Sequence, residues 1–115
     1  MADASLASEQ YCYLTTTGRV SGETREIEIW FALLDRTIYL LAGGGERANW
    51  VRNLRVRQEA DVQIADRAFE VTAREPSPGA EASRARRALF AKYSASGSGL
   101  ARWRDFGLLV ALDLV

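Results

Sequence analysis

Histidine is absent from this 115-residue sequence, which also contains only one cysteine, Cys12, and two prolines. Without histidine, the chain has no Ser-His-Asp triad and none of the metal sites that are built on Cys and His spacing. A single cysteine also excludes an internal disulfide. We therefore expect no metal site and no histidine-based catalysis.

Net charge is lacking as well, because fifteen basic residues balance fifteen acidic ones. No overall field attracts nucleic acid or a membrane surface, so any anion site must be a local cluster. The N-terminal "MADASLASEQ" has neither a basic start nor an apolar run, and the longest apolar stretch, near "FGLLVALDLV", is too short to span a bilayer. We expect a cytoplasmic protein without nucleic-acid partners or stable membrane insertion.

Apolar residues make up 48% of the chain, which is enough to build one core at this length. No internal repeat interrupts the sequence. The segments "SPG" at 77–79 and "SASGSG" at 94–99 have the composition of loops rather than of linkers. These features predict a single domain over residues 1–115.

A first β-hairpin is predicted where Asp35 and Arg36 separate "IWFALL" from "TIYLLA". Its first strand covers residues 25–34, which are rich in Ile, Trp and Phe. Folding the chain at this turn pairs apolar residues on one face of the sheet, namely Leu33 with Ile38 and Phe31 with Leu40.

A second hairpin is predicted at Asp66 and Arg67, between "DVQIA" and "AFEVTA". Apolar and polar residues alternate on both sides of this turn, as they do in a half-buried sheet. The expected pairs are Ile64 with Phe69 and Val62 with Val71, while Gln63 and Glu70 share the other face.

Two helices are predicted from apolar residues at helical spacing. The shorter is amphipathic and lies in "ERANWVRNLRVR", and the longer covers residues 79–93. Further strands are expected at 11–17 and in the continuous apolar run near 106–115, which should be central in the sheet. Together these elements predict an α+β, mainly β domain in which about six antiparallel strands curl into a small barrel, accompanied by two main helices.

The segment "YLTTTGRVSGETREIEIWF", residues 13–31, places hydroxyls, glycines and two arginines in one turn. Hydroxyls, backbone amides and guanidinium groups bind phosphate or carboxylate oxygens. The alternative is a β-hairpin with a solvated tip, because threonine is common in strands and arginine on surfaces. Composition alone does not decide between them.

A second candidate segment is "AGGGERANWVRN", residues 42–53. Three glycines after a strand let the backbone approach a planar ligand, and the following helix N-terminus offers amides to a negative group. Such turns also occur as plain connectors, and Trp50 and Asn53 are more often a core anchor and a cap than ligand contacts. The spacing is not that of a dinucleotide fingerprint.

Tyrosine must supply protons if the chain itself does so, because histidine is absent. Tyr93 is the candidate among several residues that otherwise serve as packing side chains. The others are Tyr11, Tyr13, Tyr39 and Ser94.

The combination of "LTTTGRVSGETR", a two-residue hairpin, a glycine-rich turn and "NWVRNL" resembles the deazaflavin-dependent nitroreductase family. This family consists of small split β-barrel proteins related to the pyridoxamine phosphate oxidase-like flavin reductases. The resemblance implies the split-barrel fold and binding of the deazaflavin cofactor F420, whose phosphate and glutamate tail would lie at the turn and whose ring would lie beside the glycines. The residues that it implies in cofactor binding are Thr16, Thr17, Gly18, Arg19, Ser21, Thr24, Arg25, Ala42, Gly43, Gly44, Arg47, Asn49 and Trp50.

The resemblance further implies an F420H2-dependent oxidoreductase that transfers hydride to a quinone or nitro compound. Family members often carry a lysine in the second motif, where this chain has Arg47. A reductase that uses flavin mononucleotide (FMN) on the same barrel is therefore an alternative, and a non-catalytic F420 or flavin carrier is another. Apolar residues on both faces of "IEIWFALL" also favour a homodimer.

Overall fold

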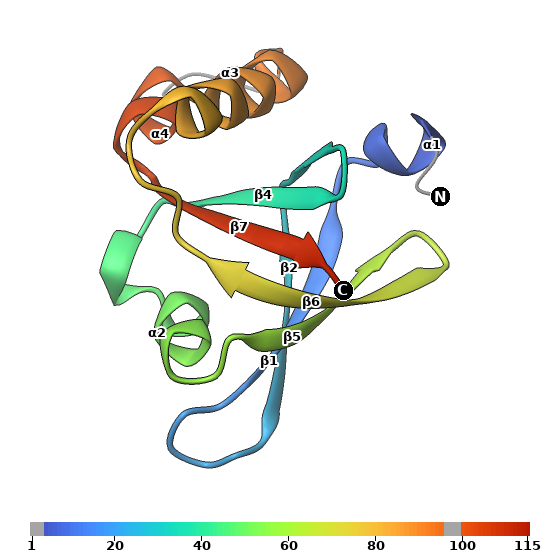
Figure 1. Cartoon of the computed structure of the whole chain (residues 1–115), viewed down its shortest axis with the longest axis vertical. Helices are drawn as coiled ribbons and strands as arrows, with labels where there is room; N and C mark the ends of the chain where they lie inside the picture. Colours follow the sequence, from blue (N-terminus) through green and yellow to red (C-terminus); the bar gives the residue numbers. More distant parts are fainter. Residues whose placement is uncertain (1–3, 96–99) are drawn as a thin grey trace.

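One curled sheet of seven antiparallel strands organises the computed structural model, which describes residues 4–95 and 100–115 (Figure 1). The sheet order is β2-β1-β5-β6-β7-β4-β3, so β7 lies between two neighbours, as predicted for the C-terminal apolar run. Of the loop predicted at 94–99, residues 96–99 lie outside the described part. The strands are β1 (Cys12–Thr17), β2 (Thr24–Ile29), β3 (Ala32–Leu34), β4 (Thr37–Ala42), β5 (Glu59–Ile64), β6 (Arg67–Arg74) and β7 (Leu108–Leu114).

The two predicted helices are confirmed as α2 (Asn49–Val56) and α3 (Ala80–Tyr93). The shorter helices α1 (Ala4–Ala7) and α4 (Leu100–Phe106) were not predicted, because so few residues show no clear helical period. A 3₁₀ turn, η1 (Gly45–Arg47), precedes α2. In Figure 1, α3 and α4 lie together at one end of the molecule, far from the β1–β2 turn at the other end.

Two apolar cores lie on opposite faces of β4 and β7, whose side chains alternate between them. Ile38 and Leu40 of β4 face the first core, where Val51 and Leu54 of α2 also pack. The intervening Leu41 faces the second core, which α3 covers with its alanines and leucine. Because both faces of these strands are buried, they read as continuous apolar runs in the sequence.

The strand predicted over 25–34 is wrong as a single element, because the chain bends at Trp30 and Phe31. Its first half becomes β2 and its second half becomes β3, at opposite edges of the sheet order, which gives seven strands rather than six. The bend leaves the backbone of Phe31 outside the ladders. Its N–H donates to the Tyr93 hydroxyl at 3.0 Å, and its carbonyl accepts from Lys92 Nζ at 2.9 Å. Side chains of α3 therefore replace the missing strand partners.

The register of the first hairpin is confirmed by the pair Leu33–Ile38. Its ladder ends at Ala32–Tyr39, so the predicted pair of Phe31 with Leu40 lies just beyond it, at the bend.

The predicted register of the second hairpin is wrong by two residues. Phe69 lies opposite Val62 rather than Ile64, and Val71 lies opposite Ala60, because the turn is formed by Ala65 and Asp66. On the other face, Gln63 pairs with Ala68, and Glu70 pairs with Asp61. A shift of two residues keeps every side chain on its face, so the apolar pattern does not distinguish the two registers.

Candidate functional site

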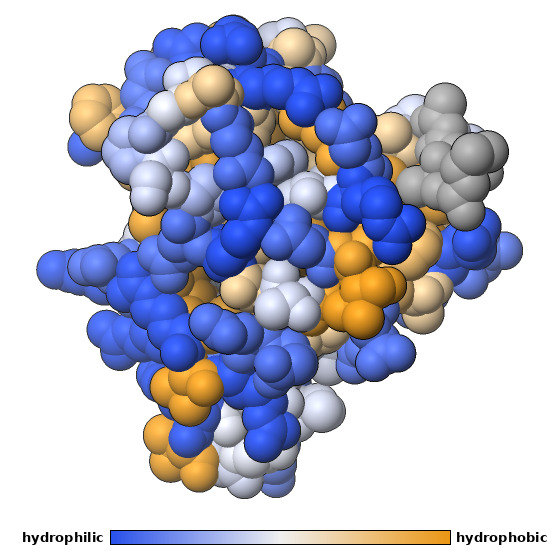
Figure 2. Space-filling view, in the orientation of Figure 1, coloured by the Kyte–Doolittle hydropathy of each residue, from blue (hydrophilic) through white to orange (hydrophobic). Residues whose placement is uncertain are grey.

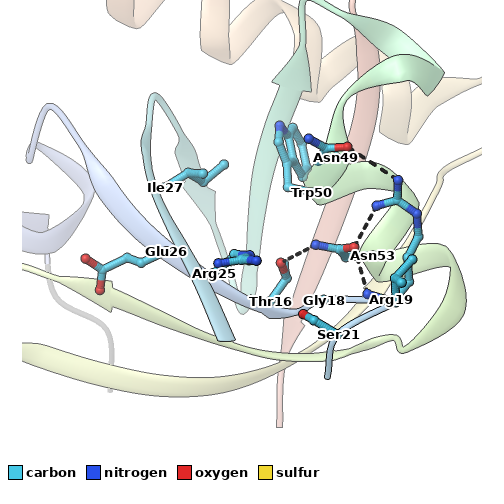
Figure 3. A pocket seen from close by; sticks show the side chains of 11 residues that line it. Thr16, Gly18, Arg19, Ser21, Arg25, Glu26, Ile27, Asn49, Trp50 and Asn53 are labelled. Carbon is cyan, nitrogen blue, oxygen red and sulfur yellow. Dashed lines mark hydrogen bonds between the residues drawn. The ribbon is translucent and has the colours of Figure 1, made fainter. Parts of the chain in front are cut away.

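A cleft of about 560 Å³ lies between the β1–β2 hairpin and α2 (Figure 3). The hairpin contributes hydroxyls and two arginines, and the first turns of α2 contribute two asparagines and a tryptophan. The lining residues are Thr16, Gly18, Arg19, Val20, Ser21, Arg25, Glu26, Ile27, Asn49, Trp50 and Asn53.

The turn between β1 and β2 is held in its wide shape by two glycines. Gly18 N–H donates to Glu23 O at 2.7 Å, and Gly22 N–H donates to Gly18 O at 2.9 Å. A Cβ atom at Gly18 would lie only 2.8 Å from Ser21 Oγ and 3.1 Å from Glu23 O, and Gly22 has a φ of +75°. A side chain at Gly18 would force Ser21 to move, and one at Gly22 would be strained, so the two glycines hold Arg19 and Ser21 on a defined backbone.

Asn53 connects α2 to the hairpin through both ends of its buried amide, as Figure 3 shows. Its Oδ1 accepts from Arg19 N at 3.2 Å and from Arg19 Nη1 at 2.9 Å. Its Nδ2 donates to Thr16 Oγ1 at 3.1 Å. Only 4% of Asn53 and 2% of Thr16 are exposed, so these bonds replace water for groups that burial would otherwise leave unpaired.

The positive charge of Arg19 is held in place without being neutralised. Its guanidinium donates to two neutral amide oxygens, that of Asn53 and, at 3.4 Å, that of Asn49. Among the described residues it makes no ion pair.

Arg25 pairs with Glu23 at 3.5 Å, but the two side chains are 61% and 70% exposed. Exposed ion pairs of this kind contribute little free energy, so a phosphate can displace the glutamate. The cleft thus offers two guanidinium groups to an anion.

The structure brings seven of the thirteen predicted cofactor-binding residues into this cleft, three from the hairpin turn, one each from β1 and β2, and two from α2. They are Thr16, Gly18, Arg19, Ser21, Arg25, Asn49 and Trp50.

The other six line no part of the cleft. Thr17 and Thr24 form a cross-strand pair that lines a hollow on the other face of the sheet, because neighbouring side chains of a strand alternate in direction. Ala42 is buried at the end of β4, while Gly43, Gly44 and Arg47 are exposed in the turn before α2.

Four lining residues were not predicted as ligand contacts: Val20, Glu26, Ile27 and Asn53. Spacing alone could have indicated two of them. Asn53 follows Asn49 by one helical turn and so shares its face, and Ile27 follows Arg25 at the two-residue period of a strand.

Tyr93 lies in the second core rather than at the cleft. Its ring stacks on Trp30 with centroids 4.1 Å apart, and its hydroxyl donates to Gln10 O at 2.7 Å. Burial raises its pKa to about 12.

The hydroxyls of two other tyrosines are bound to carboxylates, that of Tyr39 to Glu81 at 2.6 Å and that of Tyr13 to Glu28 at 2.8 Å. Tyr11 is exposed and Ser94 Oγ donates weakly to Ala91 O, at 3.4 Å. The lining of the cleft contains none of these groups.

Within residues 4–95 and 100–115, no group of three or more His, Cys, Asp or Glu side chains is placed to hold a metal ion. In the same residues, no helix is long and apolar enough to cross a membrane.

A sequence model described as F420H(2)-dependent quinone reductase matches residues 4–109. No curated protein sequence matches the chain at a significant level.

Among solved structures, an F420-H2 dependent reductase, FDR-A, is 22% identical over 90% of this chain and 94% of its own, with a TM-score of 0.72. HutZ, described as the heme storage protein of Vibrio cholerae, is 13% identical over 93% of this chain and 82% of its own, with a TM-score of 0.75. A protein described as a domain-swapped dimer is 20% identical over 90% of this chain and 80% of its own, with a TM-score of 0.73. At these identities the likeness shows the fold alone.

Proposed function

The chain belongs to the F420H2-dependent quinone reductase family, and on this basis we propose that the cleft between the β1–β2 hairpin and α2 binds F420 and presents it to a small electron-poor acceptor. F420 is the cofactor of this family, and the protein is an oxidoreductase. The observation that carries the proposal is the pair of guanidinium groups in the cleft: Arg19 makes no ion pair among the described residues, and Arg25 pairs only with the exposed Glu23.

The residues of the cleft suit the anionic part of F420. A phosphodiester and several carboxylates need more donors than a hairpin tip does, and the β1–β2 hairpin supplies the guanidinium groups of Arg19 and Arg25 and the Ser21 hydroxyl. The N-terminus of α2 adds further donors, because Ala48 at its N-cap provides no side-chain hydrogen bond to the first amides. These donors surround one space, so the tail can be bound at several points.

The apolar part of the cleft suits a planar ring system. Trp50 and Ile27 line it and also pack against the first core, so core packing fixes their positions. The volume of about 560 Å³ is in the range of small-molecule sites. When bound in its reduced form, F420 supplies a hydride to an acceptor such as a quinone or a nitro compound.

The chain's own contribution is binding and orientation. Asn53 sets the direction of Arg19, and α2 holds Asn53 and Trp50 on one rigid element. The polar groups of the cleft are hydroxyls, amides, guanidinium groups and the carboxylate of Glu26, none of which is a usual proton donor at neutral pH. We infer that water supplies the proton that accompanies reduction of the acceptor.

The cofactor is tested by titrating the purified protein with F420 and with FMN while following tryptophan fluorescence. Trp50 lines the cleft, whereas Trp30 and Trp103 lie against the second core, so a Trp50→Phe variant separates the signals. We expect F420 to quench Trp50 and the variant to lose this response. Tight FMN binding without a response to F420 would establish the FMN-dependent alternative instead.

Turnover separates a reductase from a cofactor carrier. Reduced F420 is mixed with quinones and nitro compounds, with and without the protein, and its oxidation is followed by absorbance. We expect the protein to accelerate oxidation by at least one acceptor class. If bound F420H2 is oxidised no faster than the free cofactor across the panel, the carrier hypothesis replaces the enzymatic one.

A further inference from the structure

A second hollow, of about 290 Å³, lies on the other side of the β1–β2 turn from the cleft. We call it the outer hollow. It shares Gly18, Arg19, Val20 and Ser21 with the cleft, and it adds Val56 and Arg57 from the end of α2, together with residues of the turn. The two spaces therefore border the same few residues, and a flexible ligand that leaves the cleft across the turn enters the outer hollow.

Arg57 brings a positive charge to the outer hollow. Its backbone N–H closes α2 by donating to Asn53 O at 2.9 Å, while its exposed side chain makes no ion pair or side-chain hydrogen bond to any described residue. Arg55, two residues earlier, is bound by Glu75 at 2.7 and 2.8 Å and by Glu46 at 3.3 Å. The chain thus neutralises one arginine of this helix end and leaves the next one available.

We propose that the outer hollow is a subsite for the carboxylates of the F420 tail and that Arg57 binds them. This inference rests on the proposed function, since it takes the phosphate-proximal part of the tail to lie in the cleft near Arg19 and Arg25. A glutamate side chain combines methylene groups with a carboxylate. The exposed Val20 and Val56, 94% and 69% accessible, offer contact to the former, and Arg57 offers a charge-assisted hydrogen bond to the latter.

The charge around the outer hollow limits how far the tail extends. The adjoining hollow shares Thr17 and Arg57 with it but is lined by three carboxylates, Glu59, Asp61 and Glu70. A tail that continued past Arg57 would meet like charges. The subsite consequently binds the glutamates nearest Arg57, and we expect further glutamates to add no affinity.

The test compares F420 that carries its glutamate tail with F420 from which the glutamates have been removed. Equilibrium dialysis measures the dissociation constant of each form for the parent protein and for Arg57→Ala. The matched control is Arg87→Ala, which removes another exposed arginine without ion pairs among the described residues, on α3 at the far end of the molecule (Figure 1). Arg57→Lys keeps the charge at the subsite, and thermal denaturation verifies that each variant folds.

Arg57→Ala should weaken binding of tailed F420 about five- to tenfold and leave binding of the truncated form unchanged. Arg57→Lys should retain part of the affinity, Arg87→Ala should retain all of it, and the difference should shrink at high salt. Unchanged binding of the tailed form by Arg57→Ala, or an equal loss for both forms, would overturn the subsite. Failure of the parent protein to bind either form would overturn the proposed function itself, so the two failures are distinct.

Discussion

Arg19 and Arg25 illustrate how two similar residues reach one site in different ways. Arg19 is tied to α2 through amide oxygens, and its orientation is therefore set before a ligand arrives. Arg25 projects from β2 on the same face as Thr16, its cross-strand partner, and holds only an exposed glutamate. Pre-oriented donors lose less conformational entropy on binding than mobile ones.

Replacement of either arginine by alanine should lower the affinity for F420 by one to two decades, because a charge-assisted contact contributes about 1.5 to 3 kcal/mol. The free energy of unfolding should change by no more than about half a kcal/mol, since both side chains are exposed. Titration and urea denaturation measure the two effects. Variants that bind normally but unfold more easily would show that the turn is only structural.

Asn53→Asp tests whether the free charge of Arg19 matters. A carboxylate in place of the amide oxygen, 2.9 Å from Arg19 Nη1, would neutralise the guanidinium. The Thr16 hydroxyl can rotate to donate to it, so the fold should be kept. We expect about a tenfold loss of affinity for F420 with little change in the unfolding free energy.

Asn53→Leu tests how much the hydrogen bonds of Asn53 contribute to stability. It removes the partners of the Thr16 hydroxyl and of Arg19 N–H, and it should lower the free energy of unfolding by about 1 to 3 kcal/mol. If Asn53→Asp binds F420 as tightly as the parent, the charge of Arg19 plays no part in cofactor binding.

Among the elements, α3 stabilises the bend between β2 and β3. Lys92 Nζ lies 3.7 Å from the centroid of the Phe31 ring and donates to the carbonyl of the same residue. Burial lowers the pKa of Lys92 from 10.5 to about 8, although the nearby Cys12 and Glu9 act in the opposite sense. The folded chain consequently binds fewer protons than the unfolded chain above pH 8.

Between pH 8 and pH 9 Lys92 loses its proton in the folded protein but keeps it in the unfolded chain. The free energy of unfolding should therefore rise with pH over this interval. Above pH 9 the buried Cys12, whose pKa burial raises from 9.0 to about 12, lowers stability with increasing pH. Lys92→Met should therefore abolish the rise between pH 8 and pH 9. Urea denaturation at the two pH values measures it, and an identical rise in the variant would contradict the assignment.

The β5–β6 turn contains a strained residue. Ala65 has a φ of +54°, in the left-handed region that residues with a Cβ atom avoid. Ala65→Gly should raise the free energy of unfolding by about half a kcal/mol, because relief of strain exceeds the entropy cost of glycine. Asp66→Gly, in the same turn but without a positive φ, should lower it. Equal effects of the two substitutions in thermal denaturation would refute this explanation.

At the scale of the whole molecule, the bend at Trp30 and Phe31 bears on the expectation of a dimer. The sequence favoured a dimer because "IEIWFALL" has apolar residues on both faces. Ile27 and Ile29 pack against the first core, while Trp30 and Leu34 pack against the second, so both apolar faces of this segment are covered within one chain. Hydrophilic residues predominate on the face seen in Figure 2, with hydrophobic residues in small separate groups. Phe106 on α4 is 75% exposed and is larger than the exposed valines.

A twofold dimer stays a prediction, and Phe106 is the residue that a second copy would cover. Sedimentation equilibrium at micromolar concentration should give twice the chain mass of 12.7 kDa, and Phe106→Ser should shift the protein toward the monomer. A compact monomer for the unsubstituted protein would remove the dimer.

The sequence by itself determined the type and place of most of the main elements. Alternation with a period of two gave the Leu33–Ile38 register, and helical spacing located α2 and α3. These signals are local, because each depends on residues a few positions apart. The run of hydroxyls, glycines and arginines predicted either an anion site or a solvated hairpin tip, and the anion site stays a proposal.

Only the tertiary structure decided which of those residues share a space. It separated Thr16 from Thr17 onto opposite faces, moved the register of the second hairpin by two residues and divided the strand at Trp30 and Phe31. It also placed Asn53 against Arg19, 34 positions away in the chain. Such contacts depend on how the sheet curls and on where α2 and α3 pack against it, and local periodicity contains no information about either.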